Sequence, residues 1–254
     1  MRDLLKIWLA QMRQSTIDSR SRFPNDAGDA VFLSPHCDDI CFSLGALTHR
    51  LQAGILLNIF SISGHVARLD LAPQQLAARF ENGSPDPHIL GLSPRPEAAE
   101  AWVNWVTKMR SVEDQAFADA CGLRRIELNL PEAPLRGQHP FQGRSSTKDA
   151  FDVETALMGA LSDLAAAAKD TRPWLFCPAG IGGHIDHLLV RDAILKHLGE
   201  LQQLYRIAFY EDLHYASDRL KRWQGLAEFH AAARRLNLSR IKLPMQGGCG
   251  QKLR

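Results

Sequence analysis

Two short runs of histidine and aspartate contain the side chains of this sequence that are best suited to chemistry. The first run is Ser34–Asp39 (SPHCDD), and the second is Gly182–His187 (GGHIDH). Together they offer imidazole and carboxylate ligands of the kind that Zn²⁺ accepts in catalytic sites, with others left for proton transfer. Such a metal brings the pKa of water from about 15.7 toward about 7, and a nearby carboxylate can take the proton as water attacks an amide carbon. The two runs therefore predict a metal-dependent hydrolase.

Each run also has an ordinary structural explanation when it is taken alone. Asp38 and Asp39 precede a helical segment, so they could simply accept hydrogen bonds from the exposed N–H groups of its first turn. His184 or His187 by itself is more often a structural or surface histidine. Because both runs follow a strand-like segment and precede a helical one, we favour the metal site over either explanation.

The elements that must position these runs alternate along the chain. Strands are expected at Ala30–Ser34, Ile55–Ile62, Arg125–Leu130, Trp174–Cys177 and Tyr205–Tyr210. Helices are expected at Cys41–Leu51, Val112–Cys121, Val153–Ala168 and His187–Leu198. Strands separated by helices of about 10–15 residues indicate βαβ units. We therefore predict a single α/β domain over residues 1–254, Rossmann-like, with a mainly parallel sheet flanked by helices and a site at the carboxyl ends of its strands.

Two segments fall outside this alternation. Within residues 1–28 we predict an amphipathic helix and a linker, because apolar side chains recur at helical spacing. That helix packs on the domain or, as an alternative, contacts a membrane surface or a partner. Residues 64–105 contain many prolines and little periodicity, so we expect a variable insertion that serves as a lid or substrate loop.

Composition narrows the classes of function. The formal charge of +2, the pI near 8.3 and the lack of a dense Lys/Arg run argue against a nucleic-acid partner. No run of about 18 apolar residues occurs, so no transmembrane segment is expected. The five cysteines are scattered without a CxxC pair, which favours neither disulfides nor a cysteine zinc site. A reducing, cytoplasmic location is the simplest interpretation, and a homo-oligomer remains open.

The two runs resemble the signatures of a known family. SPHCDD and GGHIDHLLVRDA are similar to the His-x-Asp-Asp and His-x-Asp-His motifs of the PIG-L/LmbE-like zinc-dependent de-N-acetylases. Weaker family patterns are similar to the segments Arg110–Leu123, Glu132–Arg136 and Tyr210–Tyr215. The resemblance runs in order from Ala30 to Ala216, with residues 64–105 unmatched. It implies a Zn²⁺ cofactor and removal of an N-acyl group, expected to be acetyl, from an amino-sugar-like small molecule.

The resemblance also implies roles for individual side chains. The zinc ligands would be His36, Asp39 and His187. Asp38 would be the general base that activates water. His184 would stabilise the oxyanion or protonate the departing nitrogen, and Asp186 would orient His184.

Three further side chains are assigned to substrate contacts, each with a simpler alternative. Arg110 could instead form a surface ion pair with Glu113 on the same helix. Arg136 could hold a substrate anion or be merely solvated. His214 stands where the family pattern commonly has proline, and it faces the substrate or the solvent.

The sequence departs from the family pattern at two positions of the first motif. Cys37 stands where proline is usual, and Ile40 stands where glutamate is frequent. Neither position is a ligand in that pattern, so zinc binding is still expected. Cys37 either makes the site sensitive to oxidation or packs as a small apolar residue.

Two other functions remain open. One is a deacylase of a different amide in natural-product biosynthesis, and the other is a non-catalytic metal-binding module of the same fold. A nucleotide-binding Rossmann protein is disfavoured because no GxGxxG follows the first expected strand.

Overall fold

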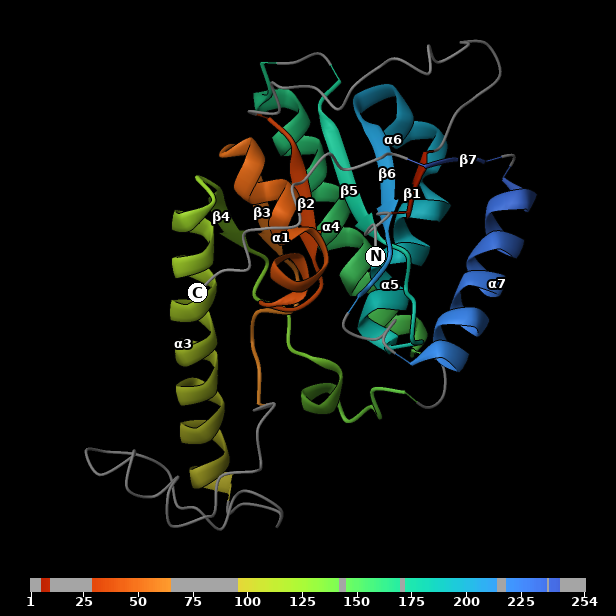
Figure 1. Cartoon of the computed structure of the whole chain (residues 1–254). Coiled ribbons are helices and arrows are strands. Elements are labelled where there is room, and N and C mark those ends of the chain that lie inside the picture. Colours follow the sequence, from red (N-terminus) through yellow and green to blue (C-terminus); the bar gives the residue numbers. More distant parts are fainter. Residues whose placement is uncertain are drawn as a thin grey trace.

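The central sheet gathers strands from most of the length of the chain. The structure is a computed structural model that describes residues 6–9, 29–64, 96–141, 145–169, 172–213, 218–236 and 238–242. Within these ranges, seven strands form one sheet in the order β4-β3-β2-β5-β6-β1-β7 (Figure 1). Their bounds are β1 Lys6–Leu9, β2 Val31–Ser34, β3 Ile55–Asn58, β4 Arg124–Glu127, β5 Trp174–Pro178, β6 Arg206–Tyr210 and β7 Ser239–Lys242.

The five neighbouring strands β4, β3, β2, β5 and β6 are all parallel. Strands β2 and β3 are buried along their whole length and are almost entirely apolar, as expected for strands covered on both faces. The chain proceeds from β2 outward to β3 and β4, and then returns to place β5 and β6 on the other side of β2. The predicted Rossmann-like α/β fold with a mainly parallel sheet is therefore confirmed. The reversal of strand order lies between β2 and β5, where open α/β sheets bind their ligands.

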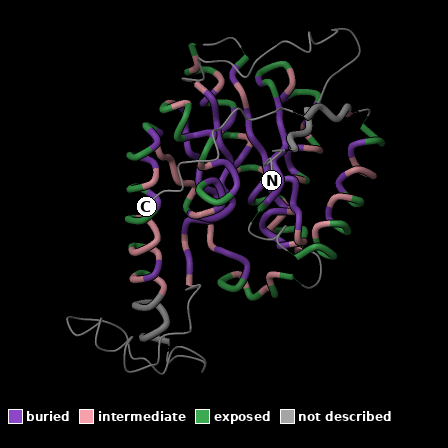
Figure 2. Tube along the Cα trace, viewed as in Figure 1, coloured by how far each residue is buried: buried purple, intermediate pink, exposed green. Residues whose placement is uncertain are grey.

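Helices cover both faces of this sheet. They are α1 Asp39–Leu51, α3 Pro96–Ala120, α4 Thr147–Ala167, α5 Ile185–Lys196, α6 Leu198–Leu204 and α7 Arg219–Arg235, with a 3-10 helix η2 at Ala133–Arg136. Alternate side chains of one strand serve opposite faces: Phe32 joins the apolar cluster of α1 and α3, whereas Val31 and Leu33 join that of α4 and α5. The buried trace in Figure 2 accordingly follows the sheet, and the exposed trace follows the outer sides of the helices.

The helix predicted within residues 1–28 is wrong where the structure describes that segment. Lys6–Leu9 form β1, which pairs antiparallel with β6 through Trp8 and Phe209 and also pairs with β7. The outer edge of β6 presents backbone N–H and C=O groups that need partners, and Ile7 and Trp8 favour strands. Pairing with a distant part of the chain thus overrides the helical spacing of the apolar residues.

The segment expected as a lid is described only in part. Residues 65–95 lie outside the described residues, so a lid remains a prediction. Pro96 already begins α3, which is much longer than the helix predicted at Val112–Cys121. The sequence reasoning also did not predict α7, which packs beside the far end of the sheet in Figure 1. No helix in the described part of the chain is long and apolar enough to cross a membrane.

Candidate metal site

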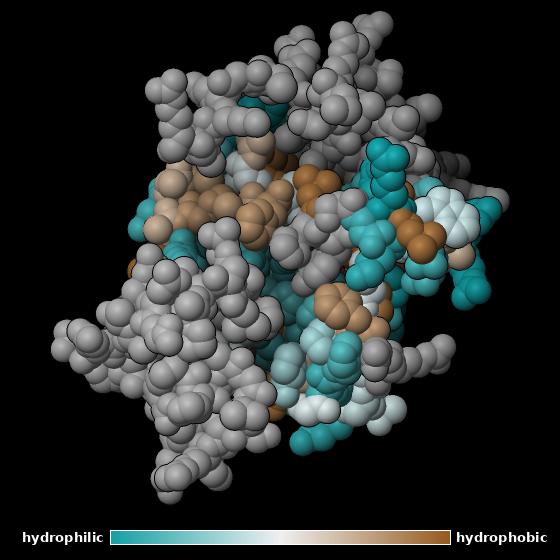
Figure 3. Space-filling view, turned by 60° about the horizontal axis from the view of Figure 1, so that its bottom comes forward, coloured by the Kyte–Doolittle hydropathy of each residue, from teal (hydrophilic) through white to brown (hydrophobic). Residues whose placement is uncertain are grey.

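Both motifs lie at the carboxyl edge of the parallel strands. Ser34–Asp39 runs from the end of β2 into α1, and Gly182–His187 leads from β5 into α5. Because β2 and β5 are adjacent and parallel, the two motifs meet at the point where the strand order reverses. Figure 3 faces this edge of the molecule and shows polar side chains gathered near its centre, with apolar ones around them.

A glycine-rich turn carries the chain from β5 to the second motif. Gly180, Gly182 and Gly183 have φ angles of 71°, 95° and 75°, a region that residues with a Cβ atom seldom occupy. The backbone N–H of Ile181, within this turn, donates to Oδ2 of Asp212 over 2.8 Å. The turn is therefore fastened to the end of β6, and it sets where His184 enters α5.

Three histidines converge in the interior of this edge. His36, His184 and His187 are all buried, and they offer ligand atoms that lie within 4.8 Å of one another. Their ring centroids are 4.7–5.3 Å apart. This group could hold a metal ion, because imidazole nitrogen is a common ligand for transition metals.

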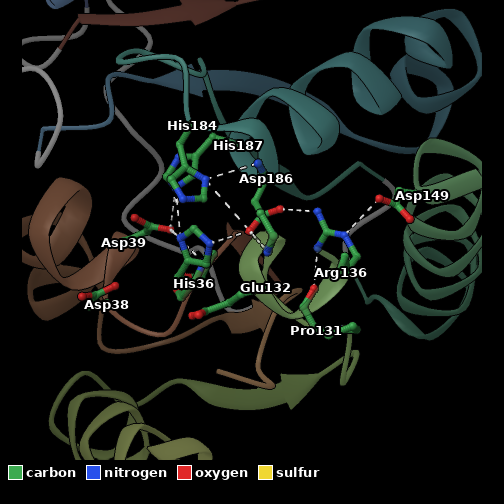
Figure 4. A network of polar contacts seen from close by, with 12 residues as sticks. His36, Asp38, Asp39, Pro131, Glu132, Arg136, Asp149, His184, Asp186 and His187 are labelled. Atoms are coloured by element: carbon green, nitrogen blue, oxygen red, sulfur yellow. Dashed lines mark hydrogen bonds and ion pairs between the residues drawn. The ribbon is translucent and has the colours of Figure 1, made fainter. Parts of the chain in front are cut away.

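Asp39 adds a carboxylate oxygen to the same place. Nδ1 of His36 and Nε2 of His187 are 3.2 Å apart, and Oδ2 of Asp39 lies 3.4 Å from the first and 3.2 Å from the second. Ligands bound about 2.0–2.2 Å from a tetrahedral zinc ion are about 3.3–3.6 Å apart. The three atoms therefore form a triangle whose edges fit one ion, and Figure 4 shows the side chains turned toward one another.

Two further carboxylates hold the rings of this triangle. Nε2 of His36 donates to Oδ2 of Asp186 over 3.0 Å, and Nδ1 of His187 donates to Oδ1 of Asp212 over 2.6 Å. The other ring nitrogens, Nδ1 of His36 and Nε2 of His187, are the ones that face each other and Asp39. A carboxylate of this kind fixes both the tautomer and the orientation of a ligand histidine.

The geometry of Asp186 differs from the expected pairing with His184. Oδ2 of Asp186 is 4.0 Å from Nδ1 of His184 but 3.0 Å from Nε2 of His36. Nδ1 of His184 instead accepts from the backbone N–H of Asp186 over 3.3 Å. The carboxylate thus orients His36, while the backbone at the start of α5 orients His184.

Burial and charge act on these groups in opposite directions. Burial lowers the pKa of His36 and of His187, but nearby carboxylates outweigh it, so the pKa of His36 is raised well above its usual value and that of His187 to about 9. Burial would raise the pKa of Asp39, yet His187 and His36 hold it well below its usual value. For His184, burial and then the other two imidazoles lower the pKa to about 3. The interior therefore holds an ionised carboxylate beside a neutral His184.

Asp38 stands apart from this buried group. Its side chain is 45% exposed, and it makes no side-chain capping hydrogen bond to α1, so the simple capping explanation is not supported for it. Arg110 of α3 donates from Nη2 to Oδ1 of Asp38 over 3.0 Å, and its Nη1 lies 3.6 Å from Oε1 of Glu132. Arg110 therefore bridges the carboxylates of Asp38 and Glu132.

Arg136 points into the protein instead of into solvent. Its Nη2 donates to Oδ1 of Asp186 over 2.6 Å, its Nε lies 3.3 Å from Oδ2 of Asp149, and its Nη1 donates to the carbonyl oxygen of Pro131. The side chain is only 10% exposed, so the alternative of a merely solvated arginine does not hold. His214, the third residue assigned to substrate contacts, lies outside the described residues.

An aromatic side chain borders His184. The ring of Phe141 meets His184 edge to face, with centroids 5.1 Å apart and an interplanar angle of 88°. Nζ of Lys221 in α7 lies 5.3 Å from the centroid of Phe141, and Phe141 remains 46% exposed. Phe141 thus forms part of the wall between the histidines and solvent.

Cys37 lies inside the protein next to His36 in the sequence. Burial raises the pKa of its thiol to about 12, and the charge of Asp114 adds to this effect. A thiol with so high a pKa is a poor nucleophile and reacts slowly with oxidants. The structure therefore favours packing over oxidation sensitivity for Cys37.

The sequence reasoning missed two residues of this site. Asp212 occupies a position just after the end of β6, and a carboxylate at the carboxyl end of a third parallel strand was the signal that could have revealed it. Phe141 lies in a loop without any recognisable pattern, so nothing in the sequence indicated that it would contact His184.

Comparison with known proteins shows similarity to a characterised deacetylase. The chain is 30% identical over 197 residues to 2'-N-acetylparomamine deacetylase of Streptomyces fradiae, a match that includes 76% of this chain. It spans 59% of the length of that relative. No protein-family model matches the chain.

Solved structures of two deacetylases are also similar. A deacetylase from the biosynthesis pathway of teicoplanin shares the fold, with a TM-score of 0.50 and 19% identity over 82% of this chain and 86% of that one. The A40926 pseudoaglycone deacetylase Dbv21 has a TM-score of 0.48 and 20% identity, over 84% of this chain and 85% of that one.

Proposed function

We propose that this chain is a member of the PIG-L/LmbE-like family and a zinc-dependent hydrolase that removes an N-acetyl group from an amino-sugar-containing small molecule, as its similarity to a deacetylase suggests. The products would be a free amine and acetate. The observation that carries the proposal is the triangle of His36 Nδ1, Asp39 Oδ2 and His187 Nε2, with edges of 3.2–3.4 Å.

The donor set fits zinc better than the hard cations. Two imidazole nitrogens and one carboxylate oxygen suit a borderline ion such as Zn²⁺, whereas Mg²⁺ and Ca²⁺ prefer oxygen ligands throughout. Zinc, when bound, acts as a Lewis acid that polarises a carbonyl oxygen and makes water more acidic. Three protein ligands are also the number found in catalytic zinc sites, which keep a position open for reactants.

Asp38 is the proposed general base. Its carboxylate is adjacent in sequence to the ligand Asp39 but remains partly exposed, so an incoming water can reach it. The hydrogen bond from Arg110 to Oδ1 leaves Oδ2 to accept the proton of the attacking water. Arg110 thereby holds the carboxylate in one orientation, as a general base that must reach the attacking water requires.

His184 is proposed to act on the amide itself. Its ring is oriented by the backbone at the start of α5, since Nδ1 accepts from the N–H of Asp186. Its Nε2 then carries the proton and can donate a hydrogen bond to the carbonyl oxygen as negative charge develops there. Preorganised donors of this kind are among the largest contributors to acyl-transfer catalysis.

The substrate class follows from the relative and from the site together. The relative is named for an N-acetylated amino-sugar substrate, and the match includes 76% of this chain. Phe141, beside His184, offers an exposed ring on which the apolar face of a sugar can pack. We therefore propose 2'-N-acetylparomamine and N-acetylglucosamine conjugates as the first compounds to assay.

Metal content and turnover together test the proposal. Wild type, His187→Ala and Asp38→Asn are purified in parallel without chelator, and their zinc is measured by elemental analysis. We expect about one zinc ion per wild-type chain, a strong loss in His187→Ala, and retention in Asp38→Asn with acetate release reduced by about 10²–10⁴-fold.

The outcomes separate the competing functions. A wild-type chain that takes up no metal even when zinc is supplied would overturn the hydrolase mechanism. Zinc bound at full occupancy without acetate release from any N-acetylated amino sugar would favour a deacylase of another amide or a non-catalytic metal-binding module.

A further inference from the structure

Arg136 forms a chain of contacts that ends at the proposed metal site. We propose that Arg136 is a positioning residue: it holds Asp186 against Nε2 of His36 and so keeps Nδ1 of His36 turned toward Asp39 and His187. The inference rests on the proposed metal site. It replaces the expected role of Arg136 as a contact for a substrate anion.

Arg136 itself is held in place by several parts of the protein. Its Nε lies 3.3 Å from Oδ2 of Asp149 at the start of α4, and its Nη1 donates to the carbonyl oxygen of Pro131. The guanidinium also lies over the ring of Phe60, 4.8 Å from its centroid. Arg136 is thus anchored on three sides by elements that do not belong to either motif (Figure 4).

Arg136 in turn fixes the carboxylate of Asp186. Nη2 of Arg136 donates to Oδ1 of Asp186 over 2.6 Å, while Oδ2 accepts from the backbone N–H of Ala133 over 3.0 Å. The Asp186 side chain is fully buried, so these protein groups take the place of water for it. With both oxygens engaged, the carboxylate has one orientation.

The Asp186 carboxylate in turn orients the ring of His36. Oδ2 of Asp186 also accepts from Nε2 of His36 over 3.0 Å, so in the neutral form of the imidazole, which is the form that binds a metal, the proton resides on Nε2. Nδ1 then presents its lone pair toward Oδ2 of Asp39 and Nε2 of His187, at 3.4 and 3.2 Å. A substitution of Arg136 should therefore change the orientation of the His36 ring as a metal ligand.

The chemistry of the side chain suits this role. A guanidinium has a planar fork of five N–H donors, so it can serve Asp149, Pro131 and Asp186 at the same time. An ammonium group at the same place has three donors without a fixed plane, and could not preserve all these contacts. A substrate anion would in turn have to compete with two carboxylates that already surround a guanidinium only 10% exposed.

Three variants test the inference. Arg136→Met removes the donors, Arg136→Lys keeps the charge without the fork, and Arg191→Met is a matched control on α5. Arg191 is comparably buried, 12% exposed against 10%, and it pairs with Asp192 rather than with Asp186. Zinc affinity is measured by competition with a chromophoric chelator, and the visible absorption of the Co²⁺-substituted proteins reports ligand geometry.

We expect zinc affinity to fall by about 10- to 100-fold in Arg136→Met, the range seen when partners of metal ligands are removed, and by less in Arg136→Lys. The Co²⁺ bands should shift in both variants but not in Arg191→Met. If Arg136→Met does not fold, as judged by circular dichroism and thermal melting, Arg136→Lys carries the same test with the same two measurements.

One outcome would overturn the inference in favour of a substrate contact. In it, the Arg136 variants have the same zinc affinity and Co²⁺ spectra as wild type but a raised KM for an N-acetylated amino sugar. A wild-type chain that binds neither Zn²⁺ nor Co²⁺ would overturn the proposed function and this inference together. The two failures are therefore distinguishable from the wild-type measurement alone.

Discussion

Nδ1 of His187 donates a hydrogen bond of 2.6 Å to Oδ1 of Asp212, and both side chains are buried. Oδ2 of the same carboxylate accepts from the backbone N–H of Ile181 in the turn that leads to His184. One aspartate at the end of β6 therefore fixes a candidate metal ligand and the turn before the second motif together. This link joins the chemistry of the site to the packing of the sheet.

Replacement of Asp212 by asparagine should weaken metal binding while leaving the ligands intact. The amide cannot accept from both His187 and Ile181 as a carboxylate does, so the imidazole loses its fixed orientation. We expect zinc affinity to fall by about 10- to 100-fold, measured by chelator competition. Asp163→Asn, an exposed change on α4, is the matched control and should bind zinc like wild type. Equal affinities for the two variants would show that Asp212 does not support the site.

A methyl group at Gly225 should destabilise the turn that carries His184. A Cβ atom there would lie 3.1 Å from Cα of Ile181 and 3.2 Å from the nitrogen of Gly182, and that backbone is held by Asp212. We expect Gly225→Ala to lower the free energy of unfolding by about 1–3 kcal/mol in denaturant titrations.

Gly159→Ala is the control for that substitution. Gly159 lies within α4, and a Cβ atom added there has nothing within 4 Å. It should raise the free energy of unfolding by about 0.5–1 kcal/mol, because alanine favours the helix. The prediction for Gly225 fails if both variants become more stable.

Removal of the Phe141 ring should weaken substrate binding in the proposed reaction. The ring borders His184 and keeps nearly half of its surface open, so it is available to pack against a sugar. Loss of an aromatic contact worth about 1 kcal/mol corresponds to a roughly fivefold rise in KM for an N-acetylated amino sugar. Phe151→Ala removes another exposed phenylalanine ring, on α4, and its KM should match that of wild type. A KM that rises equally in both variants would argue against a role for Phe141 at the site.

The buried Asp114 should make stability depend on pH. Burial raises its pKa from the ordinary 3.8 to about 6, although Asn58 and Arg125 oppose the shift. The folded protein thus binds the carboxyl proton of Asp114 more tightly than the unfolded chain does. The contribution of this proton to the free energy of unfolding is complete below about pH 4 and is lost as pH rises through about 6.

The asparagine in Asp114→Asn does not titrate, so the variant should not lose stability in this way as pH rises. We expect the Tm of the variant relative to wild type to rise between about pH 4.5 and about pH 7.5, measured by thermal melting in matched buffers. Asp119→Asn, an exposed change on the same helix, serves as the control and should show no such trend. A constant Tm difference for Asp114→Asn across this range would contradict the raised pKa.

The sequence by itself determined the architecture and the edge of the sheet at which both motifs lie. Apolar strands such as Val31–Ser34 alternate with amphipathic helices, which leads to a parallel sheet, and a parallel sheet brings its carboxyl ends to one edge. The sequence thus predicted that SPHCDD and GGHIDH lie at the same edge of the sheet, whereas the pairing of β2 with β5, which brings His36 close to His187, came from the tertiary structure. The prediction of the shared edge needs only short-range pattern and topology.

The tertiary structure decided which partner each polar group has. Asp186 lies with His36 rather than His184, Arg136 turns inward to Asp186, and Asp212 reaches His187 across the sheet. The strand at Lys6–Leu9 likewise exists because β6 offers an edge far away in sequence. Each of these choices depends on contacts between segments separated along the chain, whose free energies come from packing and burial and leave no local pattern in the sequence.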